Sequence, residues 1–418
     1  MEQGLTSRRR LAAHVAGLMA AVVCVAAGPT AASASRVETA SGSTIRIGLL
    51  VSSEGPFANN SATAQRGAEF AVQTLNDAGG VGGHPIELVV ADSHGQPDQL
   101  ATIIPRLATE DNVIAIVGPV ESASCDVACP LALQHELPMV SPGAARPGVL
   151  EPGRPYTFSL AQPDAANSTP ALGAIIADRE ITTAAIILDE ANATTAAQAD
   201  LFRATFEAAG VEVVDEVTYT SGDSSFAAQI TQIASSEPDA IALAAGPADA
   251  GRIAVEVDAQ GLESQLLGTG SLQSDINGFL EAAGDAAEGT LSAAQYNPNS
   301  PDPAVSELLA AGAEELGVDE VPLNFAYGYD AVNIIASIIE AEGLTGDSAT
   351  LADDRIAIQE GLNGLEEFIG MADRTEFGDD GFSMRPILIA EIVDGEVVIT
   401  EVATEGDSDA VTETTEAA

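Results

Sequence analysis

The chain has 418 residues, of which 63 are acidic and 15 are lysine or arginine, so its formal net charge is -48 at pH 7. All 15 are arginine, and this absence of lysine excludes P-loop, Schiff-base and serine–lysine chemistry. The acidic excess argues against nucleic-acid partners, which are bound through basic side chains that neutralise phosphates. Because 46% of the residues are hydrophobic, we expect folded domains. Their acidic surface indicates either adaptation to high salt or a genomic bias towards arginine and alanine.

The first residues have the order of an export signal. Arginines at 8–10 precede an apolar run over 11–27, and a small-residue cleavage pattern ends at Ala34. The arginine run resembles a twin-arginine signal, and a general secretory signal is the alternative. We therefore expect a signal peptide over 1–34, a linker over 35–43, and a protein exported across the cytoplasmic membrane to the periplasm or the cell surface.

The cysteines leave two questions open. Cys24 lies in the apolar run, and Val23 stands where a lipidation site needs a small residue, so a lipid anchor at Cys24 is the weaker alternative. Cys125 and Cys129 remain after cleavage, and export favours a disulfide between them. Their spacing within one expected helix works against a bridge, because the two Cβ vectors must converge. Two cysteines without a nearby histidine do not predict a metal site.

Strand-like and helix-like segments alternate along the chain. In the first half we expect strands over 45–50, 86–91, 113–117 and 138–141, with helices over 62–76, 99–108 and up to about 136. The rhythm restarts with strands over 184–188, 211–217, 240–243 and 266–269, and helices over 194–209, 226–235 and 248–259. A helix over 325–342, a hairpin of strands 386–393 and 396–401, and an acidic tail over 403–418 complete the chain. This pattern predicts an α/β fold of two similar doubly wound lobes with parallel sheets.

Ligands of doubly wound sheets bind outside the carboxyl ends of the strands. The loops that follow the expected strands are 52–61, 118–124, 141–146, 189–195 and 269–274. A search for catalytic motifs finds neither G-x-S-x-G nor H-E-x-x-H. His94 and Asp92 share a strand end and form a weak candidate for a metal site, and a polar strand end closed by Gly95 is the favoured interpretation. We expect no enzyme, no metal and no cofactor.

Short motifs in a fixed order point to a family. They are IRIGLL at 45–50, GPFA at 55–58, RGAEFAV at 66–72, LNDAGGV at 75–81, GHPIEL at 83–88, LPMVSPGA at 137–144, YDA at 329–331 and FGDDG at 377–381. As an ordered set over about 44–400, they resemble the periplasmic-binding-protein type I family. The matching branch is that of ABC-transporter solute-binding proteins, which includes the leucine/isoleucine/valine-binding proteins.

The resemblance implies two lobes joined by a hinge of three strands that closes on a ligand. The expected crossings are near 158–161, 291–296 and 372–376. The N-terminal lobe would then contain 44–160 and 297–373, and the C-terminal lobe 161–296 and 374–402.

The resemblance also implies a function. It is that of an exported solute-binding protein of an ABC importer, a monomer that captures a small polar solute between its lobes and delivers it to permease subunits. The solute would be an amino acid or a related carboxylate or amide. A ligand-sensing receptor of the same fold is the alternative, and a secreted hydrolase is the weaker one.

The family's ligand contacts carry over unevenly. Ser122 matches the serine that holds a ligand carboxylate, and its alternative role is a helix N-cap. The other candidate ligand residues are Ser141, Gly143, Ala144, Asn60, Asn192, Thr194, Gly270 and Tyr329. Two family features are missing: Ala145 replaces a hydroxyl residue, and no acid lies near Gly270 in the sequence to meet a ligand ammonium. The sequence therefore predicts solute binding more firmly than it predicts an amino-acid ligand.

Overall fold

The computed structural model describes residues 42–402, apart from positions 56, 190–191, 221–222 and 224. The expected signal peptide, the expected acidic tail over 403–418 and most of the expected linker lie outside the described residues. No helix in the described part of the chain is long and apolar enough to cross a membrane.

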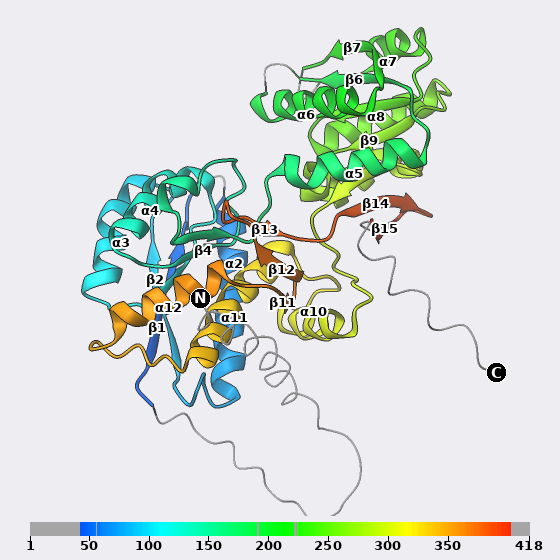
Figure 1. Cartoon of the computed structure of the whole chain (residues 1–418). Helices are drawn as coiled ribbons and strands as arrows, with labels where there is room; N and C mark the ends of the chain where they lie inside the picture. Colours follow the sequence, from blue (N-terminus) through cyan, green and yellow to red (C-terminus); the bar gives the residue numbers. More distant parts are fainter. Residues whose placement is uncertain (1–41, 56, 190–191, 221–222, 224, 403–418) are drawn as a thin grey trace, which may run out of the picture. The chain divides into compact units, whose positions relative to one another are not determined.

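The chain forms two compact units, and most of their helices and strands are labelled in Figure 1. Among the described residues, unit 1 contains 42–163 together with Pro298–Arg385, and unit 2 contains Asp164–Asn297 together with 386–402. The α/β fold with mainly parallel sheets is as predicted. The units divide between Pro163 and Asp164, between Asn297 and Pro298, and between Arg385 and Pro386, in segments without regular secondary structure, and the expected hinge of three strands stays a prediction.

Unit 1 is built on a five-stranded parallel sheet with the order β2-β1-β3-β4-β5. The strands are β1 (Ile45–Val51), β2 (Ile86–Asp92), β3 (Ala115–Val117), β4 (Met139–Ser141) and β5 (Thr157–Ser159). The helices are α2 (Ala58–Asp77), α3 (Leu100–Thr109), α4 (Ser122–Gln134), α10 (Pro303–Leu316), α11 (Leu323–Glu342) and α12 (Leu351–Asn363), with short turns η2 (Pro97–Gln99) and η3 (Glu151–Gly153). Every residue of β3, β4 and β5 is buried, as in parallel sheets that helices cover on both faces.

Helices α2 and α11 pack closely through two glycines. A Cβ on Gly67 would lie 2.0 Å from the carbonyl oxygen of Phe325, and one on Gly328 would lie 2.0 Å from that of Ala64. Side chains at these positions would push the helices apart, so the glycines fix the interhelical distance. Thirteen residues of α11 are buried, which makes it the central helix of this unit.

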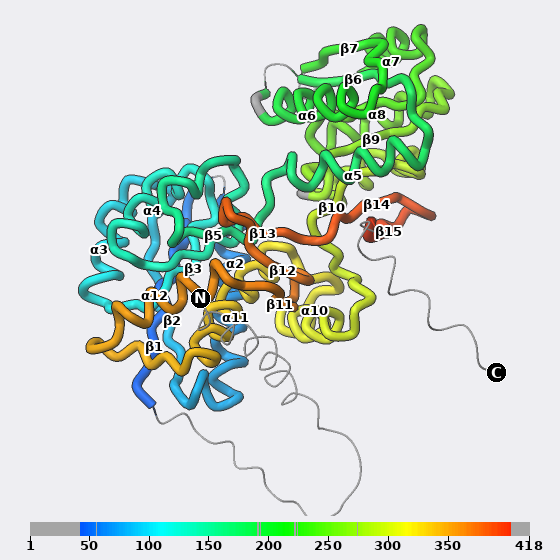
Figure 2. The backbone as a smooth tube through the Cα atoms, in the orientation of Figure 1, coloured from blue at the N-terminus to red at the C-terminus, as the bar shows by residue number. Residues whose placement is uncertain are grey.

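Unit 1 also contains a small antiparallel sheet with the order β11-β12-β13, shown beside α10 and α11 in Figure 2. Its strands are β11 (Phe368–Gly370), β12 (Asp373–Phe377) and β13 (Ser383–Met384). Residues 374–385 therefore belong to unit 1, and their expected place in the second lobe is wrong because β12 pairs with β11. Arg385 secures the end of this segment, because it donates to the Ala372 carbonyl oxygen and lies 4.9 Å from the centre of the Tyr327 ring.

Unit 2 contains a seven-stranded sheet with the order β15-β14-β10-β9-β8-β6-β7. The strands are β6 (Thr183–Leu188), β7 (Glu212–Thr218), β8 (Ala240–Ala244), β9 (Gln265–Gly268), β10 (Leu291–Ala294), β14 (Leu388–Val393) and β15 (Glu396–Glu401). The helices are α5 (Asp164–Asp178), α6 (Ala193–Ala209), α7 (Ala227–Ala234), α8 (Pro247–Ala259) and α9 (Ile276–Ala283), with turns η4 (Gly270–Asp275) and η5 (Gly284–Ala287). Strands β14 and β15 run antiparallel to their neighbours and form the expected hairpin.

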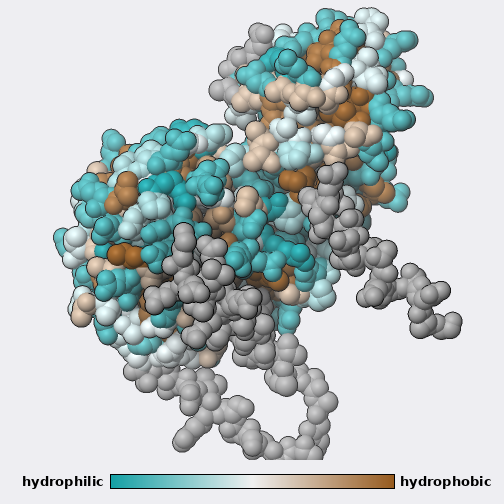
Figure 3. Space-filling view, viewed as in Figure 1, coloured by the Kyte–Doolittle hydropathy of each residue, from teal (hydrophilic) through white to brown (hydrophobic). Residues whose placement is uncertain are grey.

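Both faces of this second sheet are covered. Alternate residues of β6 enter two different core clusters, with Ala185 and Ile187 in one and Ala184 and Ile186 in the other. This alternation follows from the two-residue period of a strand. Outside the cores, hydrophilic residues predominate on the face shown in Figure 3, in keeping with the acidic composition.

Candidate functional site

Unit 1 places its candidate residues at the carboxyl ends of β3 and β4. Ser122 is the first residue of α4, which follows β3, and Gly143 and Ala144 follow β4. In an open α/β sheet this edge is where ligands bind. The structure therefore brings together the loops that the sequence predicted to hold a solute carboxylate.

Ser141 is committed to the interior of the unit. It is fully buried, and its hydroxyl donates to the carbonyl oxygen of Pro119 at 2.6 Å. The Ser141 hydroxyl oxygen also accepts from the amide N–H groups of Ala144 at 2.9 Å and Gly143 at 3.3 Å. Ala144 is fully buried as well. The expectation that these two residues contact the solute is corrected: they shape the loop, and only Gly143 among the three is partly exposed.

The Ser122 hydroxyl has an unused proton. Its oxygen accepts from the amide N–H groups of Ala145 and Arg146, each at 3.2 Å, and so joins the two loops. A serine hydroxyl accepts two hydrogen bonds and donates one. No acceptor for the donated proton is present among the described residues. Glu121, at the N-cap of α4, makes no side-chain capping bond, so the first amide groups of this helix also lack a cap.

The two other candidate residues of unit 1 differ in exposure: Asn60 is exposed and Tyr329 is buried. Asn60 lies exposed in the first turn of α2, near Phe57, whose side chain is 46% exposed. Tyr329 lies in the interface of α2 and α11, where its ring centre is 5.7 Å from that of Phe70. Burial raises the pKa of Tyr329 to about 12. The expectation that Tyr329 forms a wall of the ligand site is corrected, because the side chain packs in the core.

In unit 2, Asn192 and Thr194 form the start of α6. The Asn192 side chain accepts from the amide N–H of Thr194 at 2.9 Å and caps the helix. Both residues are exposed. The structure assigns Asn192 a structural role at the carboxyl end of β6, and a contact with solute stays a prediction.

The structure supplies an acid beside Gly270, contrary to the sequence reading. Asp164, the first residue of α5, reaches this position, and an ideal Cβ built on Gly270 would lie 3.1 Å from its Oδ1 atom. Ser168, one turn along the same helix, donates to Asp164 Oδ1 at 2.8 Å and accepts from the Gly270 amide at 2.9 Å. Asn167 is directed at the same glycine, with its Oδ1 atom 3.3 Å from the ideal Cβ. These residues were missed, although polar residues at spacings of three and four on an otherwise apolar helix give a readable signal.

Burial raises the pKa of Asp164, and hydrogen bonds from Ser168, Ser271 and Thr269 oppose that rise. The dominant effect is therefore desolvation of a carboxylate that has only hydroxyl donors around it. Such a group favours a nearby positive charge.

The cysteines are free thiols, so the expected disulfide is wrong. Cys125 and Cys129 are both buried in α4. Side chains at this spacing lie one above the other on one helix face, and their Cβ atoms do not converge as a bridge requires. The hydrogen bond with the Cys129 side chain and burial raise the pKa of Cys125, which keeps the thiol protonated and unreactive.

The polar groups at the end of β2 bond to one another. Asp92 accepts from the Ser53 amide N–H at 3.0 Å and lies 3.0 Å from His94 Nδ1. No group of three or more His, Cys, Asp or Glu side chains in the described part of the chain could hold a metal ion.

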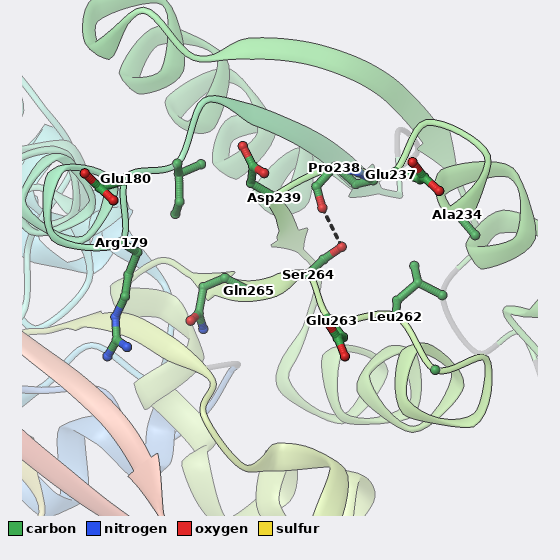
Figure 4. A pocket seen from close by; sticks show the side chains of 12 residues that line it. Arg179, Glu180, Ala234, Glu237, Pro238, Asp239, Leu262, Glu263, Ser264 and Gln265 are labelled. Carbon is green, nitrogen blue, oxygen red and sulfur yellow. Dashed lines mark hydrogen bonds between the residues drawn. The ribbon is translucent and has the colours of Figure 1, made fainter.

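A pocket of about 730 Å³ lies at the opposite edge of the second sheet (Figure 4). Its lining includes Ile181, Asp239 and Gln265, which precede or begin β6, β8 and β9. This is the amino end of parallel strands, where ligands of such folds do not bind. Hydrogen bonds from Thr182 and Thr183 lower the pKa of Asp239 to about 2. The Asp239 carboxylate therefore stabilises the local backbone at this edge of the sheet.

Comparison with known proteins places this geometry in a family. The model of the periplasmic binding protein family matches residues 44–396. The chain belongs to the periplasmic binding protein family. The predicted resemblance to type I members of the leucine/isoleucine/valine-binding branch is confirmed by the relatives. Members of this family bind solutes, and periplasmic binding proteins of ABC importers are exported.

Three relatives illustrate the similarity. Leu/Ile/Val-binding protein homolog 3 of Brucella melitensis is 26% identical over 335 residues, covering 80% of this chain and 88% of the relative. Leu/Ile/Val-binding protein BraC3 of Rhizobium johnstonii is 27% identical over 337 residues, with the same coverage. An ABC transporter substrate-binding protein from Sphaerobacter thermophilus, a solved structure, has a TM-score of 0.69 at 25% identity, covering 87% of this chain and 97% of that one.

Proposed function

We propose that this periplasmic binding protein captures a small solute bearing a carboxylate, an amino acid or a close relative, for the membrane subunits of an ABC importer. The observation that carries the proposal is the Ser122 hydroxyl, which accepts two backbone N–H groups and keeps its proton for an external acceptor. The named functions of the relatives support the same class of solute.

The surroundings of Ser122 suit an anionic group. The uncapped start of α4 carries amide N–H groups and the positive end of the helix dipole. Arg146 is close by, but it forms an ion pair with Asp126, so its charge is largely neutralised. A carboxylate at this position would therefore be held mainly by the hydroxyl and by backbone amides.

We further propose that the protein acts as an exported monomer, with the arginines at 8–10 as part of a twin-arginine signal. The small solute and the permease subunits are then its partners.

Substitution of Ser122 tests the carboxylate role. We expect Ser122→Ala to weaken the binding of carboxylate solutes by about 1–3 kcal/mol, because it removes a hydroxyl whose proton has no acceptor among the described residues. Isothermal titration with an L-amino acid that binds and with its carboxamide measures this, and the carboxylate should lose more affinity than the carboxamide. Ser306→Ala, in the first turn of α10, is the matched control and should bind normally. Equal affinity of the Ser122→Ala variant and the native protein would remove Ser122 from the site.

A further inference from the structure

An ion pair between Asp126 and Arg146 lies beside the Ser122 hydroxyl. Asp126 is in α4, four residues after Ser122, and residues at this spacing share one helix face with Cβ atoms about 5–6 Å apart. Arg146 belongs to the loop after β4, and its backbone N–H donates to the Ser122 hydroxyl oxygen at 3.2 Å. Both partners of the pair are therefore attached to the proposed carboxylate site, and both belong to unit 1.

The fold does not depend on this ion pair. The Asp126 and Arg146 side chains are 55% and 51% exposed, and exposed ion pairs contribute little to stability because solvent screens them. The loop after β4 is fixed instead by the buried Ser141 hydroxyl, which bonds to the Pro119 carbonyl oxygen and to the Ala144 amide. The pair therefore matters more for the charge of the site than for the shape of the loop.

Asp126 sets the charge that Arg146 presents. The guanidinium forms no ion pair with another acid among the described residues, so without Asp126 it would carry a full positive charge beside the bound carboxylate. A guanidinium binds carboxylates through charge-assisted and often bidentate hydrogen bonds. With Asp126 in place that charge is offset, and the Asp126 carboxylate itself repels a further negative group.

We propose that Asp126 is a specificity-determining residue, which withholds the Arg146 charge from the solute and so favours zwitterions and singly charged carboxylates over solutes with two negative groups. This inference rests on the proposed function. Every group that it invokes belongs to unit 1.

Removal of the Asp126 charge tests this role. The twenty common L-amino acids are screened by thermal shift with the mature protein, and the tightest binder is titrated by calorimetry into the native protein and into Asp126→Asn, which keeps the size of the side chain. We expect the variant to bind about 3-fold more tightly, because the guanidinium is released to attract the carboxylate. L-Aspartate and L-glutamate should gain more than L-asparagine and L-glutamine. The gain should shrink at high ionic strength, because salt screens the released charge.

Two further variants separate a released charge from an altered structure. Asp126→Asn combined with Arg146→Gln should lose most of the gain, because no guanidinium is left to act on the solute. Glu87→Gln is the matched control: Glu87 pairs with Arg46 at the amino end of the same sheet, with side chains 52% and 47% exposed, and this variant should bind like the native protein. Circular dichroism and the melting temperature check that each variant is folded.

The outcomes separate the inference from the proposed function. If Asp126→Asn binds carboxylates only as tightly as the native protein, or more weakly, the inference is overturned while carboxylate binding stands. A gain that persists undiminished at high ionic strength or in the double variant overturns it as well. If no carboxylate binds to the native protein at all, the proposed function itself fails.

Discussion

Each unit contains a carboxylate whose pKa is raised by burial, and the two carboxylates differ in their partners. Asp330 in α11 of unit 1 is fully buried and accepts from the amide N–H groups of Met371 at 2.7 Å and Ala372 at 2.9 Å, with the positive charge of Arg385 nearby. Asp164 in unit 2 has only hydroxyl donors. Burial raises the pKa of Asp330 to about 6 despite these donors. The comparison teaches that backbone N–H donors and a nearby arginine tie Asp330 to the fold, whereas no arginine or histidine among the described residues forms an ion pair with Asp164.

The largest expected difference between the two acids concerns stability. Asp330→Asn should lower the free energy of unfolding by about 3 kcal/mol, because the amide cannot accept from both backbone groups and leaves Arg385 without its counter-charge. Asp164→Asn should change it by less than about 1 kcal/mol, since no buried cation loses a partner. Urea denaturation followed by circular dichroism measures both variants. Similar losses of stability would show that Asp164 is a structural acid like Asp330.

A smaller effect is expected in the pH dependence of binding. Because burial raises the pKa of Asp164, this residue of the free protein takes up a proton at a higher pH than an exposed aspartate does, and the neutral acid no longer attracts an ammonium group. Affinity for an amino acid should therefore fall as the pH is lowered, and it should be restored as the pH rises. Titration calorimetry at several pH values measures this.

The Asp164→Asn variant is the control for that profile. It should bind weakly at every pH, with a flatter profile than the native protein. The control also separates Asp164 from Asp330, whose pKa burial raises to about 6. An equally steep profile in the variant would assign the titration to another group.

Much of the fold follows from local sequence patterns. The aliphatic runs that become β1 and β6 and the Asp394-Gly395 hairpin were predictable, because buried parallel strands and tight turns have strong local signals. The small sheet was not, since β11, β12 and β13 are two to five residues long and are defined by pairing alone. That is why the segment up to Arg385 was placed in the wrong lobe.

The candidate site shows the same division. Ser122 was predictable because it follows a strand and begins a helix. The position of Asp164 beside Gly270 was not predictable. Ser168, which bonds to both residues, is 102 residues away from Gly270 in the sequence, and only the packing of α5 against the end of β9 brings them together. Tyr329 and Ser141 were assigned to the site because the sequence does not reveal which side of an element faces the core. Burial in the folded protein decides that question.

The most direct test of solute capture is native mass spectrometry of the purified, mature protein, followed by release and chemical identification of any bound molecule. We predict a retained molecule of amino-acid size that carries both a carboxylate and an amine, displaced from the native protein by excess L-amino acid. A retained molecule without a carboxylate, such as a neutral sugar, would contradict the proposed function. A retained carboxylate without an amine would contradict the pH dependence expected from Asp164.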